Sequence, residues 1–431
     1  MRHEPAAERP RAFQHRNYRL FFSGQLISLV GTWMQTVAQA WLVLDLTGDP
    51  FLLGLVAAMQ FLPVMVLGLF GGLIADALPK RRTLIATQTI QMVLAFVLFG
   101  FGLTAGGVVE VWQIMVLALL LGITNAVDMP TRQSFVVEMV GRGDVANAVA
   151  LNSAIFNTAP IVGPAIAGLA IGAFDISIAF LLNGLSFLAV IVAYAMMRDE
   201  ELASPPVFNR PHTVREVGQT LAEGVRYVRR TDVILLATVI VGLVSLFGMN
   251  FGVIIPALAR DVLHTDATGY GFLMAASGIG SLAAALGIAF SGRSMPANIA
   301  AGALLLGVAE IAAAAIHVYP LALVAMAFVG FGAIGMAATA NTVIQLAVPN
   351  ELRGRVMSVY TTVFVGSSPI GGLLMGGIAS KFGVDVSLAV GGVACAVLGL
   401  IAFWWLRRIP ASGLLRTGVP AMPAERAPSG R

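Results

Sequence analysis

The sequence predicts an all-α integral membrane protein with twelve transmembrane helices. Its 431 residues are 58% hydrophobic and 11% charged, whereas about 25% of residues are charged in soluble domains. Apolar stretches of about 20 residues, long enough to cross a hydrocarbon core, recur along the chain. They lack the alternation of apolar and polar residues that a transmembrane β-barrel needs. Helices are therefore the remaining way to satisfy the backbone in lipid.

Each expected span is a continuous apolar run, with ends uncertain by a few residues. The spans cover residues 19–44, 51–75, 83–105, 111–130, 145–173, 177–197, 233–258, 269–291, 297–318, 320–346, 356–380 and 385–407. We expect no cleavable signal peptide, because the arginine-rich start leads into a hydrophobic run that is too long for a signal core.

The basic residues indicate the orientation, since they are retained on the cytoplasmic side of short loops. With the N-terminus in the cytoplasm, all but two of the 26 lysines and arginines fall in cytoplasmic segments. The exceptions are Arg260 and Lys381. One missed span would scatter the charges over both faces, so the number of spans and the orientation support each other. Both termini are expected in the cytoplasm.

The longest polar stretch, residues 198–232, has six spans on each side. The expected organisation is a cytoplasmic segment (1–18), a six-helix bundle (19–197), a cytoplasmic linker (198–232), a second six-helix bundle (233–408) and a disordered tail (409–431). Apolar residues recur at helical spacing between Val214 and Val228, which predicts an amphipathic helix in the linker.

The two bundles are expected to be pseudo-symmetric, as in transporters built from parallel repeats. When the fifth span is aligned with the eleventh, Pro160 falls on Pro369, Gly163 on Gly372 and Gly168 on Gly377. Coincidence between glycine-rich helices is the rival explanation.

Several function classes are excluded by what the sequence lacks. The net charge of +4 could suggest nucleic-acid binding, but the basic residues lie at helix ends without an aromatic-lined surface. Cys395 is the only cysteine, and the five histidines lack ligand spacing. No P-loop, GxSxG or HExxH motif occurs. We therefore expect no nucleic-acid partner, no enzyme activity, no metal and no cofactor, and a monomer in the bilayer.

One face of the first span is polar, and lipid is an unfavourable neighbour for it. The stripe, with three- and four-residue spacing, consists of Gln25, Ser28, Thr32, Gln35 and Gln39. It either lines a cavity or forms hydrogen bonds between helices, which contribute about 1 kcal/mol or less each.

Acidic residues inside spans are candidates for proton transfer, because a charge at the bilayer centre costs several kcal/mol. Glu310 lies deepest, and Asp128 lies nearer the cytoplasmic end of its span. Arg132, four residues on, is placed to neutralise Asp128 on the same helix face. Asp128 is the first candidate and Glu310 the second, with a structural role as the alternative for each.

Five stretches of the chain resemble the major facilitator superfamily, and within it the bacterial drug and siderophore efflux branch. Residues 72–82 are similar to its helix 2 to 3 signature through Gly72, Asp76, Lys80, Arg81 and Arg82, with departures at Ala77 and Pro79. Residues 163–168 resemble its antiporter motif through Gly163, Pro164 and Gly168. Residues 17–21, 41–48 and 349–358 are similar to the efflux branch in particular.

The resemblance implies roles for these residues. Asp76 and the basic cluster would form a conformational lock, and the glycines and proline would couple helix packing to antiport. It also implies that spans 1, 4, 7 and 10 line a central cavity. In addition to the stripe on span 1, that cavity would contain Thr124, Asn125, Asn250, Asn341 and Gln345.

The resemblance further implies proton-driven export of small amphiphilic molecules, drug-like or siderophore-like, from the bacterial inner membrane. The alternatives are a proton-coupled importer or a lipid transporter of the same fold. A transport-inactive receptor or assembly factor belongs to another class, and it should expose a substantial extramembrane domain, for which the expected external loops are too short.

Overall fold

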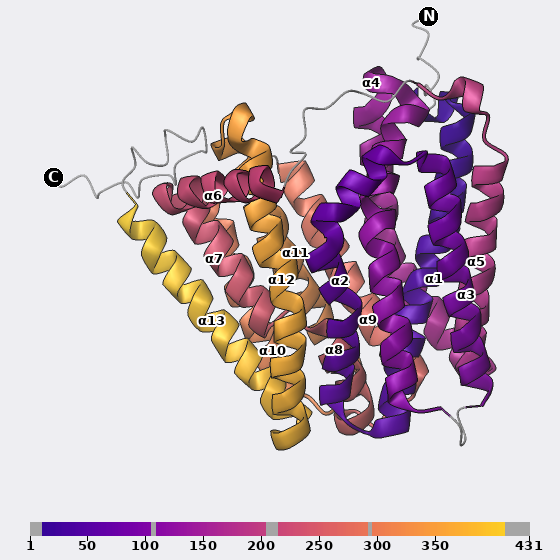
Figure 1. Ribbon diagram of the computed structural model, residues 1–431. Coiled ribbons are helices and arrows are strands. Elements are labelled where there is room, and N and C mark those ends of the chain that lie inside the picture. Colours follow the sequence, from indigo (N-terminus) through magenta and orange to yellow (C-terminus); the bar gives the residue numbers. More distant parts are fainter. Residues whose placement is uncertain (1–10, 105–108, 204–213, 292–294, 410–431) are drawn as a thin grey trace, which may run out of the picture. The chain divides into compact units, whose positions relative to one another are not determined.

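The computed structural model describes residues 11–104, 109–203, 214–291 and 295–409, and leaves out the side chains of residues 68–77, 142 and 214–220. Its described elements are helical (Figure 1). The first part of the chain forms η1 (Arg11–Gln14), α1 (Arg16–Thr47), α2 (Pro50–Ala77), α3 (Lys80–Leu103), α4 (Val111–Ala173), α5 (Ser177–Ala195) and η2 (Asp199–Glu201).

The second part continues with helices of similar length after a shorter connecting helix. It forms α6 (Val214–Arg230), α7 (Asp232–Phe247), α8 (Phe251–Ala257), η3 (Leu258–Val262), α9 (Ala267–Ser291), α10 (Pro296–Ala315), α11 (Tyr319–Ala347), α12 (Asn350–Phe382) and α13 (Val384–Arg408). Within the described parts of the chain, twelve helices are long and apolar enough to cross a membrane, which confirms the predicted fold class.

Two spans differ from the prediction in detail. The fourth span continues past residue 130 to Gly141, where φ of +69° breaks the helix between the fourth and fifth spans. This extension is stable because Phe135, Val136 and Met139 bury their side chains. The seventh span is interrupted after Phe247 and continues as α8 and the π-helical η3.

The chain forms two compact units that do not follow the linker. The first contains residues 1–210, 251–278 and 372–384, and the second contains residues 211–250, 279–371 and 385–431. Segments from the second half of the sequence thus pack with the first half. The division into bundles 19–197 and 233–408 stays a prediction about which parts move together.

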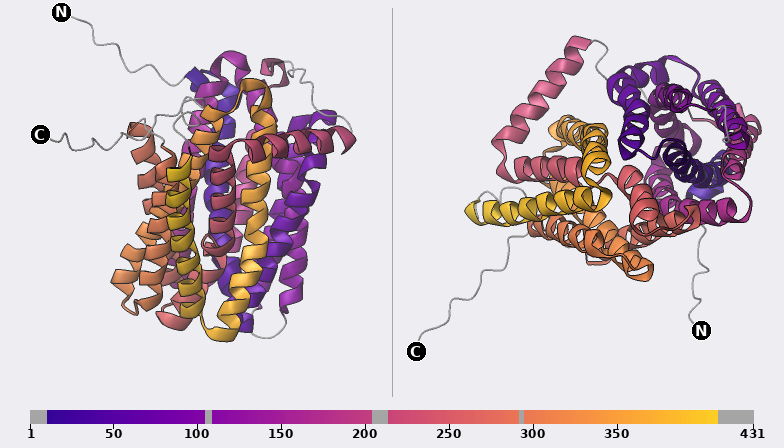
Figure 2. Two further views of the ribbon diagram at one scale, coloured as in Figure 1. Left: turned by 90° about the vertical axis from the view of Figure 1, so that its left-hand side faces the viewer. Right: turned by 90° about the horizontal axis from the view of Figure 1, so that it is seen from below.

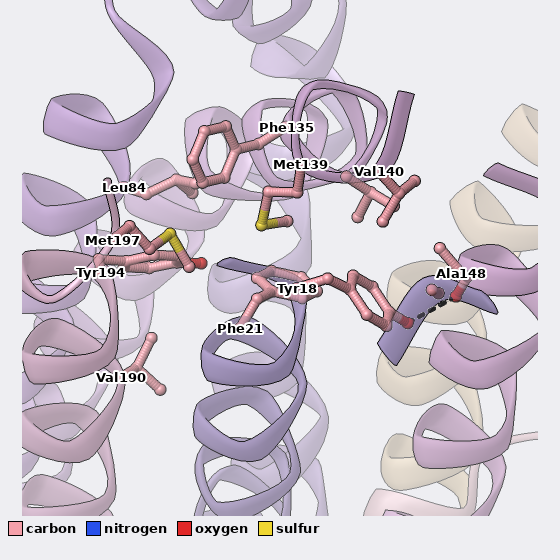
Figure 3. Packing of buried hydrophobic residues seen from close by; sticks show 12 residues of the cluster. Tyr18, Phe21, Leu84, Phe135, Met139, Val140, Ala148, Val190, Tyr194 and Met197 are labelled. Carbon is pink, nitrogen blue, oxygen red and sulfur yellow. Dashed lines mark hydrogen bonds between the residues drawn. The ribbon is translucent and has the colours of Figure 1, made fainter. Parts of the chain in front are cut away.

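In the first unit, α1, α3, α4 and α5 run side by side (Figures 1 and 2). One end of these helices encloses a hydrophobic cluster around Tyr18, Phe21, Phe135 and Tyr194 (Figure 3). The Tyr18 hydroxyl donates to the carbonyl of Ala148 at 2.9 Å. The ring of Phe21 on α1 and the ring of Phe135 on α4 both pack against the ring of Tyr194 on α5. The cluster therefore ties α1 and α4 to α5.

In the second unit, α6 runs across α7 and α12 rather than parallel to them (Figures 1 and 2). Gly224 permits this approach, because a Cβ built there would lie 2.6 Å from the backbone oxygen of Arg355. Glu223 and Arg355 form an ion pair next to it. The α6 helix is thereby fixed to the first turns of α12.

Candidate functional site

A buried polar network lies inside the first unit, around Asp128 of α4. The Asp128 side chain is 0% exposed. Thr87 Oγ1 and Gln88 Nε2 of α3 donate hydrogen bonds to its Oδ1 at 2.7 and 2.9 Å. Arg132, one turn further along α4, pairs with its Oδ2. Two donors and a guanidinium compensate a carboxylate, so this site holds a charge inside an apolar bundle.

Arg132 extends the network to two more helices. Its Nη1 donates to Oε1 of Gln25 on α1 at 3.0 Å, and Gln25 Nε2 donates to the hydroxyl oxygen of Tyr194 on α5 at 3.4 Å. Tyr194 also belongs to the hydrophobic cluster. The network therefore joins α1, α3, α4 and α5 directly beside the packed aromatic side chains.

Two polar atoms of the network have no partner among the described residues. These buried atoms are Oε1 of Gln88 and Nε of Arg132. Buried polar atoms without hydrogen bonds are uncommon, and each costs about 1–3 kcal/mol. The network thus keeps one spare acceptor and one spare donor in this arrangement.

The predicted basic cluster contains two residues with partners. Lys80 Nζ lies 2.6 Å from Oε1 of Glu138. Arg81 donates from Nε and Nη2 to the backbone oxygens of Tyr194 and Ala195 at 2.7 and 2.8 Å. A guanidinium on these carbonyls caps the C-terminus of α5 and complements its dipole.

The remaining predicted gate residues are Arg82, Gly72 and Asp76. Arg82 is exposed. The surroundings of Gly72 and the side chain of Asp76 lie outside the described part of the chain, although the backbone there is helical. The conformational-lock role of Asp76 stays a prediction.

The polar stripe of α1 is mostly buried, with Thr32 half-buried. Gln35 Oε1 accepts a hydrogen bond from Asn183 Nδ2 on α5 at 2.6 Å. Ser28 and Gln39 have no side-chain partner among the described residues. The stripe thus divides into residues that bind α5 or α4 and residues still available to a ligand.

The predicted cavity residues on the fourth span also form hydrogen bonds. Thr124 Oγ1 donates to the backbone oxygen of Leu120 at 2.8 Å. Asn125 Oδ1 accepts from Gln91 Nε2 on α3 at 3.1 Å. The first bond lies within α4 and the second joins α4 to α3, and neither tests a role in substrate binding.

The predicted cavity residues of the second unit have fewer contacts with other helices. Asn250 Nδ2 donates to the backbone oxygen of Leu246 at 2.9 Å, while its Oδ1 is buried without a described partner. Gln345 donates to Asn341 one turn earlier on α11. Gln345 is exposed and Asn341 half-buried.

The glycine-proline segment of α4 packs against two helices of the first unit. A Cβ built on Gly163 would lie 2.5 Å from the Cβ of Trp33 on α1. One built on Gly168 would lie 2.9 Å from the backbone oxygen of Thr268 on α9. Thr268 Oγ1 donates to the Gly168 oxygen at 3.1 Å. Pro164 lies inside this helix, between the two glycines. The close approach requires glycine at both positions.

The aligned segment of α12 makes an equivalent seam with α2. A Cβ built on Gly376 would lie 2.7 Å from the backbone oxygen of Pro50 and 3.3 Å from the Cα of Phe51. One built on Gly372 would lie 3.7 Å from the Cα of Gly54. At the aligned positions Gly372 and Gly377, however, an added Cβ would make only ordinary contacts, the nearest at 3.6 Å, so the internal repeat stays a prediction.

Glu310 of α10 is in a different environment from Asp128. It is 2% exposed, and its Oε2 has no partner among the described residues. A Cβ built on Gly248 would lie 3.2 Å from that oxygen and 2.6 Å from Sγ of Cys395. The carboxyl group therefore lies beside the point where α7 ends.

Sequence reasoning missed several members of the buried network. Thr87, Gln88 and Gln91 lie on α3, and Asn183 lies on α5. The signal was present, since amides inside an otherwise apolar span need partners. Their interactions depend on the rotation of each helix about its axis, which the spacing of residues in one span does not define.

Solved structures with this fold are membrane transporters. The peptide transporter POT matches with a TM-score of 0.72 and 14% identity, over 91% of this chain and 94% of that one. A bacterial homologue of the human lysosomal transporter Spinster matches with a TM-score of 0.71 and 14% identity, over 97% of this chain and 100% of that one. The chain therefore has the fold of these polytopic membrane proteins.

The sequence profile of the transmembrane secretion effectors, a family of the major facilitator superfamily, matches residues 10–414. The chain belongs to this family. The multidrug efflux pump Tap of Mycolicibacterium fortuitum is 30% identical over 393 residues, which are 89% of this chain and 94% of that protein. The staphyloferrin A transporter of Staphylococcus aureus is 23% identical over 403 residues, 91% of this chain and 96% of that protein.

These relatives confirm the predicted superfamily and its drug and siderophore efflux branch. They are transporters of small molecules rather than enzymes. The chain is thus a multi-pass membrane protein with a transport function.

Proposed function

We propose that this protein exports small amphiphilic molecules across the bacterial inner membrane by proton-coupled alternating access, with both termini in the cytoplasm. The efflux pump Tap, 30% identical over most of both chains, supports export of drug-like compounds. The more distant staphyloferrin A transporter supports a siderophore as the second candidate substrate. The distribution of basic residues supports the orientation.

The environment of Glu310 carries the proposal of proton coupling. An ionised carboxylate in an apolar interior needs a cation or several donors to offset its lost hydration. The described residues leave Oε2 of Glu310 without any such partner. We assign the transported proton to this carboxyl group, which gains a partner only when neighbouring helices move.

Asp128 is the second candidate for the proton. In the present arrangement its carboxylate is already engaged by an arginine and two hydrogen-bond donors. We therefore assign to it a gating role, together with Lys80 and Arg81.

The proposed substrate cavity uses polar atoms that the helices leave unoccupied. On α1 these are the side chains of Ser28 and Gln39, whereas the Thr32 hydroxyl already donates to the backbone oxygen of Ser28. A mainly apolar cavity with a few polar groups suits amphiphilic compounds.

The test is the accumulation of a panel of fluorescent amphiphiles by inverted membrane vesicles. In this geometry, exported compounds enter the vesicle lumen. Proton-driven export predicts uptake that begins when the gradient is imposed and stops when a protonophore collapses it. Uptake only into right-side-out vesicles would instead establish an importer.

The control for leakage is a set of vesicles that lack the protein. Accumulation that is unaffected by the protonophore would overturn proton coupling while leaving export intact. A siderophore-like substrate predicts no signal with the amphiphiles but gradient-dependent uptake of a siderophore in the same vesicles.

A further inference from the structure

Arg260 is one of two basic residues on the predicted outer side, and it has a specific partner. Its Nη1 donates a hydrogen bond to the backbone oxygen of Leu44, in the last turn of α1. Leu44 is 0% exposed, and its oxygen also accepts the N–H of Gly48 at 2.8 Å. Both acceptor positions of this carbonyl are thus occupied, one of them by a cation.

The end of α1 is suited to such a partner. Gly48 terminates the helix in the left-handed conformation, with φ of 64°. A Cβ built on Gly48 would lie 3.8 Å from Nη1 of Arg260. A guanidinium at a helix C-terminus interacts favourably with the partial negative charge there. Arg260 therefore joins the seventh span to the first through charge as well as through one hydrogen bond.

The segment that carries Arg260 has unusual backbone geometry. Leu258–Val262 form a π-helix, and the N–H of Leu263 bonds to the oxygen of Leu258 at 3.0 Å. His264, two residues beyond, has φ of +49°, which is uncommon for a residue other than glycine. Single π-helical turns and strained residues are often found at functional positions.

The neighbouring contacts belong to the same closed end of the first unit. Trp41 of α1 stacks on Tyr270 of α9, with ring centroids 6.1 Å apart. The Tyr270 hydroxyl is buried without a described partner. An unpaired buried hydroxyl weakens this contact by about 1–3 kcal/mol, so the apolar packing here is not maximally stable.

We propose that Arg260 is the latch that holds the outer side of the transporter closed, by binding the C-terminal end of α1. In the alternate state, α1 separates from the seventh span, and Arg260 exchanges the Leu44 carbonyl for water. The inference goes beyond the proposed function, because it requires only that the chain alternates access and makes no assumption about substrate, direction or coupling ion.

The test uses a cysteine at a buried position seven residues beyond Arg260, which should become accessible when this end of the first unit opens. Ala267, at the start of α9, is 4% exposed. In cells that express the Ala267→Cys variant, the rate of labelling by a membrane-impermeant maleimide measures how often this end of the first unit opens. The assay needs no substrate. The native Cys395 is 0% exposed, so the chain without the new cysteine gives the background.

Adding Arg260→Ala should raise the labelling rate about tenfold or more, because one charge-assisted hydrogen bond is lost. Arg260→Gln keeps neutral hydrogen-bond donors and should give an intermediate labelling rate. It serves as the second test if the alanine variant fails to fold. Arg260→Lys should stay within about threefold of the parent, since it keeps the cation.

Lys381→Ala is the matched control. It removes the other outer basic residue, which is exposed and has no described partner, and it should leave labelling unchanged. Equal labelling rates in the parent and in both Arg260→Ala and Arg260→Gln would overturn the proposal. So would a lower yield of folded protein without faster labelling, which would indicate a purely structural cap.

Discussion

The hydroxyl of Thr268 donates a hydrogen bond to the backbone oxygen of Gly168 at 3.1 Å, across the seam between α4 and α9. The bond is possible because Gly168 has no side chain. A Cβ on Gly168 would lie 2.9 Å from the backbone oxygen of Thr268, which is closer than packed atoms tolerate. The antiporter-like segment therefore has a direct steric requirement at this position.

We expect Gly168→Ala to lower the free energy of unfolding by about 1–3 kcal/mol, the usual cost of overpacking. Better helix propensity, worth up to about 1 kcal/mol, offsets only part of this cost. Thermal unfolding of the purified protein in detergent measures the change. Gly143→Ala is the control in the same helix, because nothing lies within 4 Å of a Cβ built there. Equal melting temperatures for the two variants would contradict the steric argument.

The pair of Asp128 and Arg132 gives a second prediction. Asp128→Asn should destabilise the protein by about 3 kcal/mol, because it leaves a guanidinium unpaired beside Gln25. This value is at the lower end of the range for buried pairs, since the Arg132 side chain is 16% exposed.

A double-mutant cycle with Arg132→Gln separates pairing from other effects. The Asp128→Asn/Arg132→Gln protein should be more stable than Asp128→Asn alone, because no uncompensated charge remains. Denaturant unfolding of the four proteins measures the coupling. Additive losses would show that the two residues stabilise the fold independently.

The sequence was sufficient to predict the fold because the bilayer constrains it strongly. Continuous apolar runs and the one-sided distribution of basic residues each indicated the same twelve spans. Hydropathy does not show, however, where a helix within a span is interrupted. The seventh span is apolar throughout residues 233–258, yet its helix is interrupted after Phe247 and ends in a π-helical turn.

The candidate site was predictable only where partners lie on one helix. Asp128 and Arg132 pair as their four-residue spacing predicts. Thr87 and Gln88 lie on another helix, so predicting their hydrogen bonds to Asp128 requires knowing how that helix is oriented about its axis. The hydrogen bond between Arg260 and the Leu44 backbone cannot be predicted from the side-chain pattern, because every residue provides a backbone carbonyl.

The basic cluster after α2 gives a third prediction, which separates two adjacent arginines. Arg81→Ala should lower the free energy of unfolding by about 1–3 kcal/mol, because it uncaps the carbonyls of Tyr194 and Ala195. Arg82→Ala should change it by about 0.5 kcal/mol or less, because Arg82 is exposed.

Melting temperatures of the two variants measure this difference, and transport assays add a second readout. Loss of transport in Arg82→Ala at unchanged stability would assign that residue to a conformational state other than the present one. Equal destabilisation by both substitutions would contradict the capping role of Arg81.

The last prediction concerns Glu310, whose Oε2 lacks a partner beside the end of α7. Glu310→Gln keeps the shape and hydrogen-bonding capacity of the side chain but cannot exchange a proton. In the proposed mechanism, this variant cannot use the proton gradient. Substrate that is already concentrated on one side should still cross, because downhill movement needs only the change of conformation.

We therefore expect Glu310→Gln to lose gradient-driven accumulation in inverted vesicles, by about tenfold or more, while its downhill efflux stays within about threefold of wild type. Glu351→Gln, the same substitution at an exposed position of α12, should preserve both activities. Wild-type accumulation in Glu310→Gln would refute its assignment as the proton carrier and leave Asp128 as the candidate. Loss of both activities, with an unchanged melting temperature, would instead assign Glu310 to the conformational change itself, because a neutral side chain would then be unable to support either process.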